Sequence, residues 1–94
     1  MIFVLANISI KDGKKEEFLK TTENILKNTR LEDGCISYKL YLDCEEDNTY
    51  VMVEQWRSDE DLDKHMETSH FTKFVEDTTD LLAKDMEINK FDVN

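Results

Sequence analysis

The sequence contains no proline and only two glycines among its 94 residues. No stretch rich in proline, glycine or serine divides the chain, so we expect residues 1–94 to form a single domain. Apolar runs are short, and none approaches the roughly 18 residues of a membrane-spanning helix. No charged-then-apolar leader opens the chain. These absences predict a cytoplasmic protein without a membrane partner.

Positive charge is also scarce, because 12 Lys and Arg stand against 22 Asp and Glu, giving a formal net charge of −10. Nucleic acids and anionic membranes select basic surfaces, so neither is an expected partner. The two cysteines, Cys35 and Cys44, lie nine positions apart on one expected strand and its exit, beyond disulfide reach. They lack CxxC spacing, so we expect reduced thiols rather than a zinc or redox site.

Alternating and helical patterns divide the chain into seven elements. Residues 2–10 are apolar on both alternating faces, which is typical of a strand covered on both sides. A helix follows the turn at 11–13, with Asp12 as a candidate N-cap, and Gly34 is expected to end it with a positive φ. Strands at 35–43 and 49–57 flank a hairpin turn at 45–48. Two short helices, capped by Ser58 and by Thr68 or Ser69, precede a last strand at 86–93.

This order, βαββ(αα)β, contains two strand–helix–strand units. Right-handed crossovers in both give a four-stranded antiparallel sheet with helices on one face, the ferredoxin-like βαββαβ arrangement of the α+β class. The other face then has no helix to cover it. We therefore predict a homodimer in which this face packs on its copy across a two-fold axis.

The candidate chemistry lies in residues 50–74. Alternation puts Glu54 and Trp56 on one face of their strand, and helical spacing puts His65 on the buried side of the helix that follows. An unperturbed histidine titrates at about pH 6.5, near the working pH, so His65 is the expected base. Glu54 would fix its tautomer by accepting a hydrogen bond from one ring nitrogen.

Two further polar residues complete the expected catalytic set. His70 lies in the first turn of the next helix, where the helix dipole favours a neutral ring, and Asn7 is a neutral donor and acceptor facing a pocket. The alternative for both histidines is a packed, hydrogen-bonded core residue, and for Asn7 a hydrogen bond to a neighbouring loop or helix end. His65, His70 and Glu54 also match the ligand types of non-haem iron, but nothing beyond residue type supports a metal, and no metal or cofactor is expected.

Apolar and aromatic side chains around this set predict a pocket for a flat, small-molecule substrate. Such residues in so small a domain also form core, which is the alternative for each. The expected substrate-binding residues are Trp56, Tyr38, Tyr50, Met52, Phe71 and Phe74.

The chain carries a motif that begins with Glu54-x-Trp56 at a strand end, continues with Ser58, an acidic run and Leu62, and ends with His65-x4-His70-Phe71. This motif, together with the element order and the length, resembles the antibiotic biosynthesis monooxygenase domain over nearly the whole chain. The resemblance implies a dimeric α+β barrel. Proteins of this fold include cofactor-independent quinol monooxygenases, anthrone oxygenases, haem-degrading enzymes and isomerases of phosphorylated sugars. Haem-degrading members carry Asn, Trp and a haem-ligating His where this chain has Asn7, His65 and Val75, so haem is not implied.

Anthrone oxygenases share Trp56 but have Asn and Tyr where this chain has Met52 and Leu62. The pair His65-x4-His70 with Glu54 is most similar to the quinol monooxygenases and sugar isomerases. The resemblance thus implies a cofactor-independent monooxygenase acting on a quinol or similar small aromatic. Its alternatives are an isomerase of a small phosphorylated ketose, with Arg57 or Lys64 at the phosphate, and a non-catalytic dimeric ligand-binding module.

Overall fold

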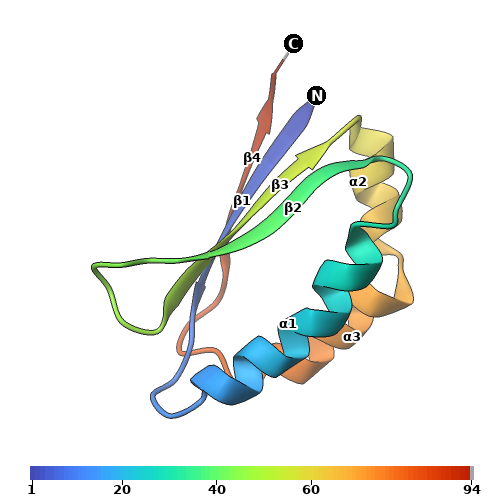
Figure 1. Ribbon diagram of the computed structural model, residues 1–94. Helices are drawn as coiled ribbons and strands as arrows, with labels where there is room; N and C mark the ends of the chain where they lie inside the picture. The colour runs from blue at the N-terminus through green and yellow to red at the C-terminus, as the bar shows by residue number, and fades with distance from the viewer. Residues whose placement is uncertain (94) are drawn as a thin grey trace.

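Four strands and three helices follow one another in the expected order in the computed structural model, which describes residues 1–93. The elements are β1 (Ile2–Ser9), α1 (Lys15–Thr29), β2 (Cys35–Leu42), β3 (Thr49–Trp56), α2 (Asp59–Met66), α3 (Ser69–Thr78) and β4 (Glu87–Asp92). The strands form one antiparallel sheet in the order β2-β3-β1-β4, and the helices lie on one side of it (Figure 1). The predicted ferredoxin-like α+β fold is confirmed.

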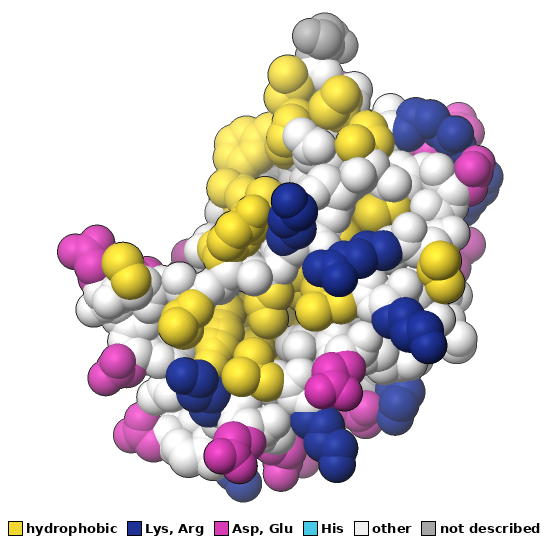
Figure 2. All heavy atoms as spheres, in the orientation of Figure 1, with side chains coloured by type: hydrophobic (Ala, Val, Ile, Leu, Met, Phe, Trp, Pro, Cys, Tyr) yellow, Lys and Arg dark blue, Asp and Glu magenta, His cyan; other side chains and the backbone are white. Residues whose placement is uncertain are grey.

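The two faces of the sheet are unequally covered. Along β1, Ile2, Val4, Ala6 and Ile8 are buried beneath the helices, whereas Phe3 and Leu5 are only half-buried. The strand register places further apolar side chains beside Phe3 and Leu5 on the side without helices. We call this side the bare face; its apolar residues are Phe3, Leu5, Tyr41, Val51, Val53 and Phe91. Figure 2 shows apolar side chains gathered over the strands near the chain termini.

Helix starts follow capping rules at two of three positions. The Ser58 side chain accepts a hydrogen bond from the Asp61 amide, and Thr68 accepts one from the Phe71 amide, as the sequence predicts. The prediction for Asp12 is wrong, because Lys14 occupies the N-cap of α1, and Asp12 instead accepts a bond from Asn48 Nδ2 at 2.6 Å. None of the helices in residues 1–93 is long and apolar enough to cross a membrane.

Gly34 serves close packing rather than a left-handed turn. The predicted positive φ is wrong, since Gly13 is the glycine with that conformation. A methyl group on Gly34 would overlap the Asp61 side chain of α2, so only glycine lets the loop after α1 approach that helix. Gly34 therefore sets the distance between this loop and the site described below.

Candidate functional site

His65 lies at the centre of a buried aromatic cluster between α2 and the sheet. Its ring is 2% exposed, and its centroid lies 4.6 Å from that of Trp56 on β3 and 5.2 Å from that of Phe71 on α3. The helical spacing of Leu62 and His65 turns both toward the sheet, as the sequence predicts. The imidazole is thus held by packing on several sides.

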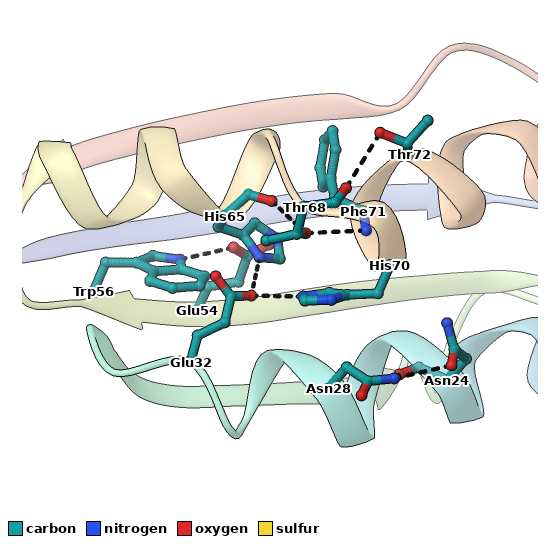
Figure 3. A network of polar contacts seen from close by, with 10 residues as sticks. All are labelled: Asn24, Asn28, Glu32, Glu54, Trp56, His65, Thr68, His70, Phe71 and Thr72. Atoms are coloured by element: carbon teal, nitrogen blue, oxygen red, sulfur yellow. Dashed lines mark hydrogen bonds and ion pairs between the residues drawn. The ribbon is translucent and has the colours of Figure 1, made fainter.

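Glu32 is the carboxylate that orients both histidines. Its Oε2 atom lies 2.7 Å from His65 Nδ1 and 2.7 Å from His70 Nε2 (Figure 3). All three side chains are largely buried, with 2% of His65, 14% of His70 and 15% of Glu32 exposed. The carboxylate reaches the histidines from the loop after α1, whereas the sequence predicts Glu54 in this role.

The shared oxygen determines which ring nitrogens carry protons. An ionised carboxylate only accepts hydrogen bonds, so His65 Nδ1 and His70 Nε2 both donate to it. In its neutral form His65 then has its lone pair on Nε2, the nitrogen that makes no hydrogen bond within residues 1–93. Burial lowers the pKa of His65 below its ordinary value, and the bond to Glu32 opposes this effect. The result is a neutral, accepting imidazole.

Glu54 has a different environment, although it lies beside the same ring (Figure 3). Its Oε1 accepts a 2.9 Å hydrogen bond from the Trp56 indole nitrogen, and its side chain is 7% exposed. Burial raises the pKa of Glu54 to about 7, with the Trp56 bond acting in the opposite direction and Glu32 adding to the rise. Glu54 is therefore a carboxyl that can hold and release a proton near neutral pH.

A cavity of about 190 Å³ opens beside His65 and Glu54. We call it the substrate cavity, after the role proposed for it in the next subsection. Its lining is mainly apolar: Val4, Ala6, Leu62, Met66, Phe71 and Ile88, with Glu54, Asp63, His65 and Lys90. The amino group of Lys90 lies 2.8 Å from an Asp59 carboxylate oxygen. An apolar chamber of this size, with a few polar groups gathered at one wall, is the usual form of a small-ligand site.

The other expected site residues fall into three groups. Phe71 lines the substrate cavity, while Tyr38, Met52 and Phe74 line a smaller space of about 100 Å³ next to it. Trp56 is fully buried and reaches the cavity only through its bond to Glu54, and Tyr50 packs edge-on against Phe18 in the core. Asn7 is exposed on the bare face, away from the histidines.

The sequence gives no local signal for Glu32, because its partners are 33 and 38 positions away along the chain. In sequence it resembles an ordinary acidic residue of a helix-ending turn. Glu32 lies two residues before Gly34, and Gly34 packs against Asp61 of α2. Only this contact, which the sequence does not reveal, indicates that Glu32 lies close to the helix that carries His65.

Glu32, His65 and His70 also have the ligand types of a two-histidine, one-carboxylate metal set, with their ligand atoms within 4.8 Å of one another. The 2.7 Å separations are those of strong, charge-assisted hydrogen bonds. The same three side chains could also close around a metal ion, and the function proposed below uses their hydrogen-bonded arrangement.

The family model described as antibiotic biosynthesis monooxygenase matches residues 1–77. An uncharacterised Synechocystis protein is 44% identical over 98% of this chain, which spans 63% of that protein's length. "Putative monooxygenase YcnE" of Bacillus subtilis is 35% identical, with 94% of this chain and 93% of that protein aligned. "Probable quinol monooxygenase YgiN" of Escherichia coli K12 is 29% identical, with 81% and 83% aligned.

Solved structures agree with the fold. A conserved protein from Methanosarcina mazei superposes with a TM-score of 0.93 at 31% identity, covering 96% of this chain and 89% of that one. The site residues thus lie on an architecture that other proteins share at modest sequence identity.

Proposed function

The chain belongs to the antibiotic biosynthesis monooxygenase family, and from that premise we propose that it is a cofactor-independent monooxygenase acting on a small quinol or similar phenol. The observation that carries the proposal is the His65 imidazole, bonded to Glu32 through Nδ1 and lining an apolar cavity. Glu32 holds the proton of His65 on Nδ1, which leaves Nε2 free to accept one. The name of the Escherichia coli relative supports a quinol as the substrate class.

Cavity size and lining support a small aromatic substrate. A cavity of about 150 Å³ holds one benzene molecule, so a cavity of about 190 Å³ fits a substrate of one or two rings. A ring placed against Phe71 and Leu62 would bring a hydroxyl group to His65. Exclusion of water by the apolar wall would keep the resulting anion reactive toward O₂.

The proposed reaction begins with removal of a proton from the quinol and ends with loss of water. His65 Nε2 takes a proton from a quinol hydroxyl, and the anion passes one electron to O₂. The two radicals combine, which forms a bond between a ring carbon and oxygen and leaves a peroxide anion. Glu54 protonates that peroxide, and the resulting Glu54 carboxylate then takes the proton of the same ring carbon, which breaks the O–O bond. One oxygen atom remains on the product as a hydroxyquinone, and the other leaves as hydroxide, which the protonated His65 converts to water.

The isomerase alternative has less support from the site. A phosphorylated sugar needs a cation, but Arg57 is exposed and bonded to Asp61 and Asp33, and neither Arg57 nor Lys64 lines the substrate cavity. Lys90 does line it but is paired with Asp59, and Asp63 lies on the same wall. An anionic substrate would therefore meet a mouth with little free positive charge. A non-catalytic ligand-binding module would need the same open space beside His65, so the oxygen-uptake test below is what distinguishes it from the enzyme.

Assembly and location are part of the same proposal. The half-buried apolar residues of the bare face support a homodimer formed by two such faces, since monomers rarely leave so continuous a patch in water. Cys35 and Cys44 are free thiols, which supports a reducing, cytoplasmic setting.

The test is oxygen consumption by purified protein supplied with menadiol, measured against autoxidation, with ¹⁸O₂ to trace the oxygen atom. We expect one labelled oxygen atom in the hydroxyquinone, and His65→Ala should lower the rate about 10²- to 10⁴-fold, as for loss of a general base. His70→Gln, which leaves His65 and Glu32 bonded, is the matched control and should lose much less. A menadiol rate equal to autoxidation, unchanged by His65→Ala, would refute the proposal.

A further inference from the structure

A second apolar space lies next to the substrate cavity, deeper between the sheet and α3. It has a volume of about 100 Å³, and we call it the inner chamber. Its floor consists of buried side chains from α1 and the sheet, among them Ile8, Ile25 and Met52, each 1% exposed. Phe74 of α3 forms part of its roof, and Val75 and Ile88, 46% and 64% exposed, lie at its rim. The chamber thus runs from the surface to the middle of the core.

The inner chamber and the substrate cavity share a wall. Ala6, Glu54, Phe71 and Ile88 line both spaces. The wall therefore includes Glu54, the carboxyl that faces the reacting end of the substrate cavity. A small molecule in the chamber would lie on the far side of that wall from His65.

The chamber is unsuited to water and to polar ligands. Its only polar side chains are Tyr38 and Glu54, and one oxygen of Glu54 is already bonded to Trp56. A buried water needs two to four polar partners, and apolar cavities that lack them stay dry and bind xenon or benzene. At about 100 Å³ this chamber is smaller than the roughly 150 Å³ of a benzene-binding cavity, which favours a gas molecule over a ring.

We propose that the inner chamber is a binding site for dioxygen, which it supplies to the substrate cavity across the wall formed by Ala6, Glu54 and Phe71. This inference rests on the proposed oxygenase reaction, in which O₂ must reach a ring carbon of a substrate that already fills the substrate cavity. A separate apolar entrance between α3 and β4 lets the gas arrive without displacing the quinol. It also keeps the route closed to water, which would quench the anion.

The first experiment needs no activity. Crystals of the full chain pressurised with xenon, a stand-in for a small apolar gas, should show one xenon atom in the inner chamber bounded by Ile25, Met52 and Phe74. Ile25→Val removes one methyl-sized group from the floor, which enlarges the chamber and should raise the xenon occupancy. Absence of xenon from the chamber in both proteins would overturn the proposal.

The second experiment separates oxygen from quinol. Val75→Phe places a larger side chain at the rim, where the helix surface tolerates change, and should raise the KM for O₂ about five- to tenfold, a range that matches the small contact surface of a diatomic ligand. The KM for menadiol should not change. Leu19→Phe, at a comparably exposed position on α1 that lines neither space, is the matched control and should leave both constants unchanged.

The outcomes distinguish this proposal from the proposed function. A raised KM for menadiol with an unchanged KM for O₂ would show that the chamber holds part of the organic substrate, which overturns the dioxygen assignment. Xenon in the chamber of a protein that oxidises no quinol would refute the oxygenase function, and with it the delivery of O₂. Xenon binding lost in Val75→Phe together with a raised KM for O₂ alone would support both.

Discussion

Consecutive residues of β3 face two different environments, and comparing them separates the chemistry of this protein from its assembly. On the helix-covered side, Tyr50, Met52, Glu54 and Trp56 are buried, and the Glu54 carboxyl is bonded to Trp56. On the bare face, Val51, Val53 and Gln55 are only half-buried. A single chain therefore brings the candidate site residues together, whereas no helix covers the opposite side of the same strand. Changes on the two sides should have different consequences.

The largest expected effect comes from placing a charge on each side of β3 at neighbouring positions. Met52→Asp would bury an ionised carboxylate without a partner, which costs several kcal/mol and should unfold the chain. Val53→Asp should leave the subunit folded but unable to pair, because repulsion across the two-fold axis replaces apolar contact. Circular dichroism reports folding, and analytical ultracentrifugation reports mass. A wild-type chain that is already monomeric in dilute solution would contradict the homodimer proposal.

Glu54→Gln should stabilise the protein at high pH. The pKa of Glu54 is about 7 in the folded protein, against 4.5 for an unperturbed group. The folded state thus keeps a proton that the unfolded state releases, and stability falls as the pH rises through that window. At pH 8 the ionisation of buried Glu54 lowers the unfolding free energy of the wild type by about 3 kcal/mol, whereas glutamine cannot ionise and avoids this loss.

Urea unfolding at pH 8 and pH 4 measures this difference. The gain from Glu54→Gln should be largest at pH 8 and close to zero at pH 4, where the glutamate is protonated in both states. Activity should move the opposite way, since the amide cannot donate the proton that the peroxide needs. A difference in unfolding free energy between Glu54→Gln and the wild type that is the same at pH 8 and pH 4 would contradict the assigned pKa.

Glu32→Gln tests the shared carboxylate oxygen. A glutamine carbonyl can accept hydrogen bonds from both ring N–H groups but lacks the charge that strengthens these bonds. We therefore expect the free energy of unfolding to fall by about 1–3 kcal/mol. Two-dimensional ¹H–¹⁵N NMR of the two histidines should show the His65 proton on Nδ1 in the wild type and a mixture of tautomers in the variant. Glu46→Gln, in the exposed hairpin turn, removes the same charge and should change neither stability nor tautomer.

The smallest expected effect is that of a chelator. The proposed reaction uses only the hydrogen-bonded Glu32, His65 and His70, so oxygen uptake with menadiol should be the same before and after dialysis against EDTA. Loss of activity that Fe²⁺ or Zn²⁺ restores would instead assign Glu32, His65 and His70 to a metal.

Local patterns predicted the fold well because each element carries its own signal. Alternation along β3 and the caps at Ser58 and Thr68 depend on neighbours within a few residues, and the structure places them as expected. The burial of His65 follows from helical spacing alone. The same reasoning failed for Asp12 and Gly34, whose roles are set by Asn48 and Asp61, residues from other elements.

The partner of His65 was beyond such reasoning for the same cause. Glu54 and Glu32 are both carboxylates, and only the packing of the loop after α1 against α2 determines which one reaches the imidazole. Asn7 shows a second limit of local patterns. Strand alternation groups Asn7 with Phe3 and Leu5 on one side of the sheet, but it does not tell which side the helices cover. The inner chamber, formed by six different segments of the chain, has no counterpart in any local pattern.

The position of Glu32 has a consequence for the nascent protein. The carboxylate belongs to the first half of the chain, whereas both imidazoles belong to the second, so neither half alone can hold the His65 proton on Nδ1 and leave Nε2 free to accept one. A partly folded or truncated molecule would hold a histidine without the group that directs it. In the proposed reaction, the proton-accepting nitrogen would therefore be ready only once both halves of the chain have folded together.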